Sequence, residues 1–254
     1  MIPHYEVTGP PGAPVVVLSS SLGTTLDMWQ PQLGTLERHF RVVRYDHRGH
    51  GRSAVPPGPY RIADLGEDVV ELLDHLGLSR VGFAGISLGG MTGIWLAANA
   101  PDRVQRLALL CTSAKLGTPE YWDQRAAAVA GGGCAAIAGT VAARWFTPGF
   151  HLREPGIVQR YTDMLAATPA AGYAACCAAI ATMDLRPELS RINAQALVVA
   201  GADDHATPPE HARQIAAGAP DAHVQVIPHA AHLASVEQPD TVAALLLRHF
   251  QGES

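Results

Sequence analysis

The sequence predicts an α/β fold, with a mostly parallel central sheet, helices on both faces and an inserted helical cap. Two observations support this prediction. Short runs rich in β-branched residues alternate with stretches whose apolar residues recur at helical intervals, first in residues 1–113 and again in residues 191–254. Between them, in residues 114–190, alanine-rich helical segments follow one another without a convincing strand. Alternating strands and helices are typical of parallel sheets whose crossover helices cover both faces.

The first expected elements are short strands. Residues 2–7 and 15–18 are expected to form two of them, and the intervening "TGPPGAP" has the composition of a hairpin connection. Residues 41–46, "RVVRYD", form the next expected strand. The stretch "ADLGEDVVELLDHLG" spaces its leucines and valines as a helix does, and "RVGFAG" then reads as a buried strand that leads to Ser87.

The later elements continue this alternation. In order they are helix 88–99, strand 106–112, strand 196–201, helix 208–217, strand 223–227 and helix 239–250. Bulky aromatic side chains such as Trp122 interrupt the alanine-rich helices of residues 114–190 and suit the lining of a pocket. We therefore expect a core of residues 1–113 and 191–254, with residues 114–190 as a cap over the strand ends, where such sheets carry their sites.

Composition and charge restrict the class of partner. A chain of 254 residues can form one large α/β domain with an insertion. The formal charge of −5 is spread along the chain without a block of Lys or Arg, which argues against nucleic acid and membranes and favours a small molecule as partner. No apolar run approaches the ~20 residues of a transmembrane helix, and we see no signal peptide.

The cysteines and histidines indicate neither disulfides nor a metal. The cysteines are Cys111, Cys134, Cys176 and Cys177. They form no C-x-x-C pair and lack the regular spacing of a disulfide framework, so we expect reduced thiols in a cytoplasmic protein. His47 and His50 in "DHRGHG" form no H-E-x-x-H pair and have no nearby set of carboxylates, so this segment is expected to form a tight structural loop near the site.

Ser87 stands in the pattern G-x-S-x-G, between Gly85 and Gly89. In this pattern the serine occupies a sharp, strained turn between a strand and a helix, where side chains at the flanking positions would clash with their neighbours. The required strand and helix are both predicted here. The turn places the backbone N–H of Leu88 at a helix N-terminus, where it can stabilise a developing oxyanion, and the loop "SSSLGTTLDMW" offers the N–H of Leu22 as a second donor.

Candidates for a base and its acidic partner follow the last two predicted strands. The loop "GADDHATPPE" contains Asp203 and Asp204, and the loop "PHAAHLASVEQP" contains His229 and His232. A histidine that is oriented by a carboxylate can take the proton of a serine hydroxyl and so activate the serine as a nucleophile. The pattern alone leaves two candidates for each role.

Over its full length the chain resembles the α/β-hydrolases and, within them, the 3-oxoadipate enol-lactonases. The resemblance rests on "YDHRGHGRS", "GISLGGM", "TPEYWDQRAAAV", "RWFTPGF", "GADDHATPP" and "AAHLASVEQP". The small polar residues of "LSSSLGTTLDMW", where many α/β-hydrolases have His-Gly, support the narrower match. The resemblance implies Ser87 as nucleophile, His232 rather than His229 as base, and Asp204 rather than Asp203 as the orienting acid.

The resemblance also implies a substrate. It implies hydrolysis of a five-membered enol-lactone that carries an acetate side chain, through an acyl-enzyme, to 3-oxoadipate in the degradation of protocatechuate or catechol, with no cofactor and no metal. The free carboxylate of such a lactone needs a cation or several hydrogen-bond donors. Trp122 and Arg125 in the cap are the candidates, with Arg144 in reserve.

Other functions share these motifs. A carboxylesterase or a carbon–carbon bond hydrolase of the same fold would keep the same serine, acid and histidine and differ in its cap. A ligand receptor built on the same scaffold would keep them too and turn over very slowly. Dehalogenases and epoxide hydrolases are disfavoured, because they have an aspartate where this chain has Ser87. The sequence predicts no oligomeric state.

Overall fold

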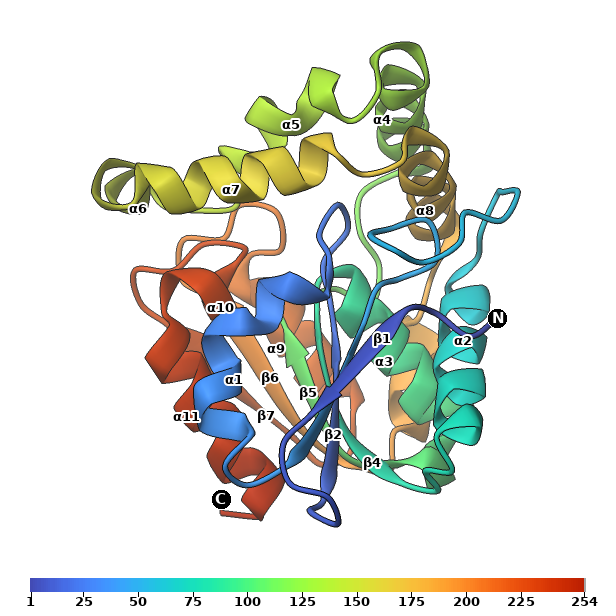
Figure 1. Ribbon diagram of the computed structural model, residues 1–254, viewed down its shortest axis with the longest axis vertical. Helices are drawn as coiled ribbons and strands as arrows, with labels where there is room; N and C mark the ends of the chain where they lie inside the picture. The colour runs from blue at the N-terminus through green and yellow to red at the C-terminus, as the bar shows by residue number, and fades with distance from the viewer. Residues whose placement is uncertain (254) are drawn as a thin grey trace.

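The computed structural model describes residues 1–253, in which a seven-stranded sheet lies between two layers of helices (Figure 1). The strands are β1 (Tyr5–Thr8), β2 (Val15–Ser19), β3 (Arg41–Tyr45), β4 (Val81–Ile86), β5 (Val104–Leu110), β6 (Gln195–Gly201) and β7 (Ala222–Ile227). Their order in the sheet is β1-β3-β2-β4-β5-β6-β7, and β1 alone runs antiparallel to its neighbour. The predicted α/β class with a mostly parallel sheet is confirmed.

Helices cover both faces of this sheet. Those of the core are α1 (Gln30–Leu36), α2 (Ile62–His75), α3 (Leu88–Asn99), α9 (Pro209–Gly218), α10 (Ala234–Glu237) and α11 (Pro239–Gln251), with short 3-10 turns η1 (Leu26–Trp29), η2 (Pro101–Arg103) and η3 (Arg186–Arg191). In Figure 1, α1 and α11 pack together on one face, and α2 and α3 pack together on the other. Helix α9 packs against β6 and β7.

The expected hairpin between the first two strands is wrong. β1 pairs with β3, and β3 lies between β1 and β2. The Gly- and Pro-rich connection does turn the chain, but it crosses the start of β3, where Gly9 lies so close to Phe40 that a Cβ at Gly9 would overlap the Phe40 carbonyl oxygen. Turn composition shows where a chain reverses and does not show which strand it will pair with.

Strand β5 ends earlier than predicted. It stops at Leu110 because Cys111 adopts φ 42°, a left-handed conformation that a strand cannot continue. The backbone N–H of Cys111 still donates to the carbonyl oxygen of Val199 in β6, at 2.8 Å. The chain therefore leaves the sheet one residue after the strand and turns toward the helices above it.

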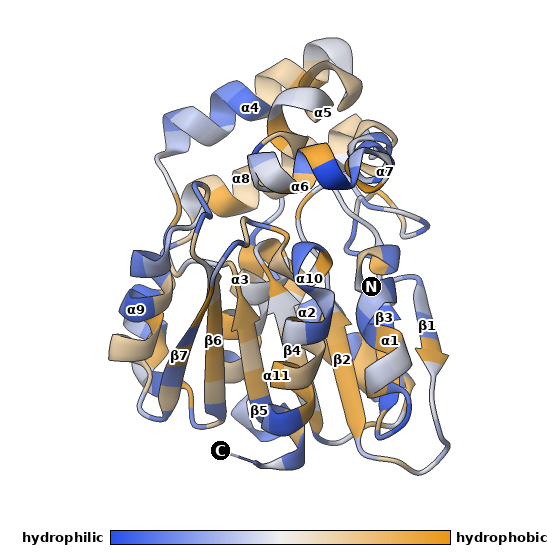
Figure 2. Cartoon of the chain, turned by 90° about the vertical axis from the view of Figure 1, so that its left-hand side faces the viewer, coloured by the Kyte–Doolittle hydropathy of each residue, from blue (hydrophilic) through white to orange (hydrophobic). Residues whose placement is uncertain are grey.

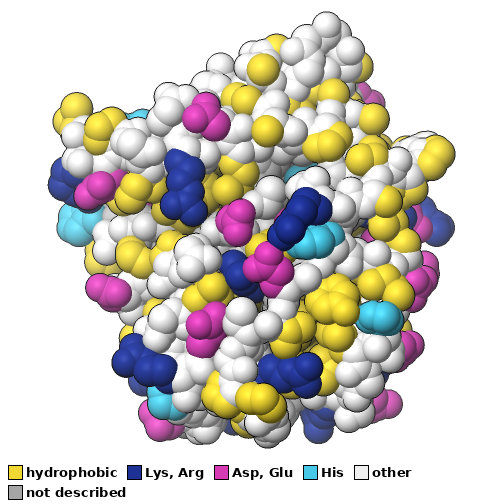
Figure 3. Space-filling model, viewed as in Figure 1, with side chains coloured by type: hydrophobic (Ala, Val, Ile, Leu, Met, Phe, Trp, Pro, Cys, Tyr) yellow, Lys and Arg dark blue, Asp and Glu magenta, His cyan; other side chains and the backbone are white. Residues whose placement is uncertain are grey.

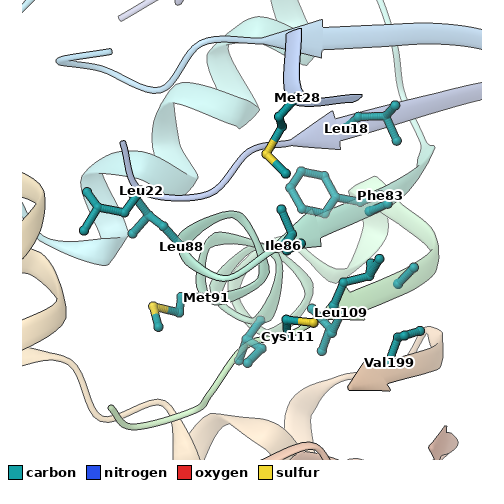
Figure 4. Close-up of a cluster of buried hydrophobic side chains, with 14 of the residues drawn as sticks. Leu18, Leu22, Met28, Phe83, Ile86, Leu88, Met91, Leu109, Cys111 and Val199 are labelled. Atoms are coloured by element: carbon teal, nitrogen blue, oxygen red, sulfur yellow. The ribbon is translucent and has the colours of Figure 1, made fainter. Parts of the chain in front are cut away.

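The hydrophobic core lies where the central strands meet α3. Every residue of β4 is buried, as expected for a parallel strand covered on both faces, whereas only Ile227 of the edge strand β7 is buried. Figure 2 shows hydrophilic residues in β7, whereas the central strands are mostly hydrophobic. Figure 4 shows Phe83 and Ile86 of β4 with Leu109 of β5 and Met91 of α3 in one cluster. This packing fixes the start of α3 relative to the strand ends.

Five helices lie above the carboxyl ends of the strands (Figure 1). They are α4 (Pro119–Gly132), α5 (Ala135–Ala142), α6 (Pro148–Arg153), α7 (Pro155–Ala166) and α8 (Ala170–Thr182). Helix α8 contacts the loop after β3, because Gly172 and Gly49 have no side chains and their backbones approach closely. Near the other end of that loop, the N–H of Tyr60 donates to the carbonyl oxygen of Ala175 at 3.2 Å. We refer to these five helices as the cap.

The surface carries no large field of one sign on the face shown in Figure 3, where basic and acidic side chains are interspersed. Among residues 1–253, no single helix has the length and apolar character to cross a bilayer; α7 and α8 meet that test only jointly, as a pair bent by 91°.

Candidate active site

Ser87 occupies the sharp turn that the sequence predicts. β4 ends at Ile86 and α3 begins at Leu88, so Ser87 alone makes the reversal, with φ 55° and ψ −115°. A non-glycine residue in such a conformation costs on the order of 1–3 kcal/mol, and surrounding bonds must hold it. Here the Ser87 N–H donates to Leu110 at 2.9 Å, and the Thr112 hydroxyl donates to the Ser87 carbonyl oxygen at 2.7 Å.

The two glycines of the pattern are required by the closeness of the backbone around Ser87. A Cβ at Gly85 would overlap the carbonyl oxygen of Gly89, and a Cβ at Gly89 would overlap that of Ser19 at the end of β2. The N–H of Gly89 also donates to the carbonyl oxygen of Ser20 at 3.0 Å. The serine turn and the loop after β2 are therefore held against each other.

Asp204 and His232 are brought together by the loops after β6 and β7. The Nδ1 atom of His232 donates to Oδ2 of Asp204 at 2.8 Å, and both side chains are buried. Of the alternative candidates, Asp203 and His229 are both exposed. Because the Nδ1–H group of His232 donates to the carboxylate, the lone pair of Nε2 is available to accept a proton from another group.

The environment of Asp204 favours its charged form. Burial alone would raise the pKa of this carboxyl, but attraction to His232 and hydrogen bonds from His232 and Thr207 outweigh burial and hold the pKa well below its usual range. The bonds to Asp204 come from the N–H groups of Ala206 and Thr207, at 2.7 and 3.0 Å, and from the Thr207 hydroxyl, at 2.7 Å. Asp204 is thus ionised and fixed in place, as an orienting acid must be.

Ser87 and His232 face the same cavity. It has a volume of about 350 Å³ and lies between the strand ends and the cap. Among the described residues no hydrogen bond joins the Ser87 hydroxyl to His232. Catalytic hydrogen bonds are often long in structures without substrate and tighten when substrate binds. The shared cavity shows that one bound molecule could contact both side chains.

The loop after β2 offers the second of the two predicted oxyanion donors. In the part of the chain that the structure describes, the backbone N–H groups of Leu22 and Leu88 donate to no protein acceptor, whereas the flanking N–H groups of Gly23 and Gly89 are both bonded. Figure 4 shows the side chains of Leu22 and Leu88 beside the start of α3, and Leu22 also lines the cavity.

Two buried histidines hold that loop, a role that sequence analysis did not assign to them. The N–H of Gly23 donates to Nε2 of His50 at 2.9 Å, and Nε2 of His47 donates to the carbonyl oxygen of Ser20 at 3.0 Å. Burial, with a smaller contribution from His50, lowers the pKa of His47 to about 3, so this ring is neutral. The motif "DHRGHG" could have suggested such a role, because it pairs two histidines with a loop that packs beside the site.

The rest of the cavity wall is mostly apolar and comes from the cap. Trp122, Ile137, Val141, Trp145 and Ile180 line it. The indole N–H of Trp122 already donates to the carbonyl oxygen of Leu116 at 2.8 Å, so this side chain offers an aromatic face and no free donor.

Arg125 is the half-buried cation of this wall. Its Nε donates to the hydroxyl of Tyr173 at 2.8 Å, and its guanidinium lies 5.3 Å from the ring centre of Trp122. Within residues 1–253 no carboxylate pairs with it. Arg144 also lines the cavity but is exposed, and one of its nitrogens donates to the carbonyl oxygen of His205 at 3.1 Å.

Other chemistries find little support in the arrangement. In the described part of the chain no group of three or more His, Cys, Asp or Glu residues is placed to hold a metal ion. The four cysteines are buried and unpaired, and burial raises the pKa of the Cys134 thiol to about 11. A thiol with a raised pKa is a poor nucleophile, so the Cys134 thiol is disfavoured as a reacting group.

Comparison with known proteins shows which family the chain resembles in sequence and in structure. The family model described as alpha/beta hydrolase fold matches residues 14–239. The 3-oxoadipate enol-lactonase 2 of Acinetobacter baylyi is 43% identical over 236 residues, which cover 93% of this chain and 88% of that protein. The crystal structure of the enol-lactonase from Burkholderia xenovorans LB400 superposes with a TM-score of 0.96 at 42% identity, covering 98% of this chain and 96% of that one.

A solved esterase is also similar. The structure of a thermophilic esterase from Thermogutta terrifontis, with malate bound, superposes with a TM-score of 0.92 at 28% identity and covers 98% of this chain and 93% of that one. The similarity in fold therefore extends to an esterase, while the sequence identity is higher to the enol-lactonases. The chain belongs to the α/β-hydrolase family.

Proposed function

We propose that this protein is a serine hydrolase that opens the lactone ring of 3-oxoadipate enol-lactone and releases 3-oxoadipate. One observation carries the proposal: Ser87, His232 and Arg125 line one cavity, with His232 bonded to Asp204 behind it, and among residues 1–253 no carboxylate pairs with Arg125. A serine nucleophile suits an ester carbonyl, and a cation suits a substrate with a free carboxylate. The high identity to enol-lactonases supports the same substrate class.

The reaction begins with attack by Ser87. Nε2 of His232 takes the hydroxyl proton while Oγ of Ser87 bonds to the lactone carbonyl carbon, and Asp204 stabilises the imidazolium that forms. The carbonyl oxygen gains negative charge, which the N–H groups of Leu22 and Leu88 are placed to receive. Each such donor is worth about 3 kcal/mol in the transition state.

Ring opening then produces an enol leaving group. The ring carbon–oxygen bond breaks, the enol oxygen takes the proton from His232, and the enol tautomerises to a ketone, which makes the step effectively irreversible. Water next attacks the acyl-Ser87 ester, with His232 again removing a proton and returning it to Oγ of Ser87. This series of steps needs no cofactor, since each proton moves between the substrate, water and the side chains of Ser87 and His232.

Arg125 is the group that we assign to the substrate carboxylate. Its guanidinium is held by Tyr173 and by the face of Trp122, so it enters the cavity in a fixed position with donors left over. Trp122 then forms part of the apolar wall beside the ring. Arg144 is a weaker candidate, because it is exposed and already donates to a backbone carbonyl.

The direct test is an assay of the purified protein on the enol-lactone, with S87A as control. A matched substrate should reach kcat/KM above about 10⁴ M⁻¹s⁻¹, whereas simple aryl esters should stay well below it. The similarity to the Thermogutta esterase favours carboxylesterase activity as the second candidate. That alternative would be preferred if aryl or alkyl esters were turned over faster than the lactone.

A further inference from the structure

We propose that Glu237 is a positioning residue for His232 and that it does so by tying the histidine loop to the cap. Glu237 lies in the short helix α10, directly after His232, and only 5% of it is exposed. It touches neither Ser87 nor the cavity, and the mechanism above makes no use of it. This inference depends on the proposed function only in taking His232 as the base.

The carboxylate of Glu237 joins two distant segments. Its Oε2 accepts the N–H of Ala231 at 2.9 Å, beside His232. Thr147, at the start of α6 in the cap, donates its N–H to both carboxylate oxygens, at 3.2 Å to Oε1 and 3.3 Å to Oε2, and its hydroxyl to Oε1. Among residues 1–253 no cation pairs with Glu237, so these donors alone compensate its burial. A buried carboxylate that depends on two segments fixes their separation.

A second bond holds the other side of the histidine. The N–H of Leu233 donates to the carbonyl oxygen of Trp145 at 2.9 Å. The residues before and after His232 are therefore both tied to cap residues 145–147, one through Glu237 and one directly. Trp145 also lines the cavity, so the segment that anchors the histidine loop is in contact with the space where substrate would lie.

This arrangement has a consequence for catalysis. Asp204 fixes the rotation of the imidazole through Nδ1, but the position of the ring depends on the backbone of residues 231–233. A shift of about 1 Å in a catalytic group can cost on the order of 100-fold in rate. Loss of the Glu237 bonds should therefore slow the transfer of the Ser87 proton to His232 and leave the substrate contacts of the cap largely intact.

The test uses E237Q, which keeps the volume but replaces one acceptor oxygen by an NH₂ group. Glutamine offers one neutral acceptor oxygen in place of two charged ones, so the three donors on Ala231 and Thr147 are left with a single, weaker acceptor. The readout is the rate at which a fluorophosphonate labels Ser87, normalised to folded protein, because labelling needs the activated serine and no lactone. E154Q, the same change at an exposed cap glutamate without side-chain bonds, is the control.

We expect E237Q to label about tenfold or more slowly than wild type, with kcat for the lactone lowered to match and KM within about twofold. E154Q should label at the wild-type rate. A labelling rate for E237Q within twofold of wild type, or a raised KM with unchanged kcat, would overturn the proposal. If the wild type failed to open the lactone while E237Q still labelled slowly, the proposed substrate would fall and this inference would stand.

A second variant covers the case in which E237Q does not fold. T147V removes the hydroxyl bond to Glu237 together with the cap bond from the N–H of Phe150, and it keeps the backbone N–H and the branched shape; T147S, which keeps both hydroxyl bonds, is its control. We expect T147V to slow labelling about threefold, and a wild-type rate would then count against the proposal. When both variants fold, we expect the double variant to label no more slowly than E237Q alone. That result would show that Glu237 and Thr147 act through the same interaction.

Discussion

The hydroxyl of Thr207 lies 2.7 Å from Oδ2 of Asp204, the same oxygen that accepts the His232 Nδ1 proton. Thr207 therefore shares an acceptor with the imidazole and limits how Asp204 can turn. Sequence analysis did not assign Thr207 to the site, although it stands three residues after the acid. The arrangement makes Thr207 part of the support of the base.

Thr207→Val should lower kcat by about tenfold, which corresponds to about 1.4 kcal/mol of transition-state stabilisation. The hydroxyl helps to lower the pKa of Asp204 and shares its acceptor oxygen with the imidazole, so its removal raises that pKa and leaves the carboxylate freer to turn. Thr207→Ser keeps the donor and should remain near wild type. Equal kcat values for the two variants would show that the bond is not used.

The sequence could predict those features of the structure that depend on residues close together in the chain. Ser87 was found because its turn needs glycines two residues away on each side, and Asp204 and His232 because they follow strands whose ends meet at one edge. Between neighbouring candidates the pattern gave no choice, and the resemblance to known enol-lactonases supplied it. Burial in the structure then separates Asp204 from Asp203 and His232 from His229.

The features that could not be predicted depend on contacts between distant segments. Glu237 bonds to Thr147, 90 residues away, and His50 to Gly23, 27 residues away. Such bonds leave no periodic signal, since they involve one residue from each segment. The pairing of β1 with β3 was missed for the same reason: a turn's composition is local, whereas strand order depends on the whole sheet.

Ser87→Gly should abolish activity and stabilise the fold. The loss in kcat is expected to be roughly six orders of magnitude, as for other removed triad serines. Relief of the strain at φ 55° is worth on the order of 1–3 kcal/mol, more than the 0.5–1 kcal/mol that glycine costs in entropy. Urea unfolding should therefore show about 1 kcal/mol of added stability for this variant.

Ser87→Ala is the matched comparison, because alanine keeps the Cβ and hence the strain. It should be as inactive as Ser87→Gly without the gain in stability. Equal stabilities for the two variants would mean that the turn at Ser87 is not strained in solution.

Arg125→Ala should raise KM for the enol-lactone by about 10- to 100-fold, the effect of losing a hydrogen bond to a charged group. kcat should change little, because the substrate carboxylate lies away from the reacting carbonyl. KM for a neutral aryl ester should be unaffected, and Arg144→Ala should alter KM for the lactone less than Arg125→Ala does. An unchanged lactone KM in Arg125→Ala would remove this residue from the substrate site.

Acid should destabilise the protein from about pH 6.5 downward, through buried histidines that stay neutral when folded. The pKa of His47 falls to about 3 because of burial, and burial also lowers the pKa of His249 to about 4. The unfolded chain protonates these rings below about pH 6.5, whereas the folded chain does not until far lower pH. Since the unfolded state binds more protons in that window, the free energy of unfolding falls as pH falls.

His47→Gln isolates one of these groups, because glutamine can still donate to the carbonyl oxygen of Ser20 but does not titrate. Urea unfolding between pH 6.5 and pH 4 should show a slope that is shallower than wild type by up to about 1.4 kcal/mol per pH unit, the linkage expected for one proton. His39→Gln, at an exposed histidine, should keep the wild-type slope. If His47→Gln and wild type lost stability in parallel, His47 would contribute nothing to the acid sensitivity, which would contradict a neutral ring at this position in the folded protein.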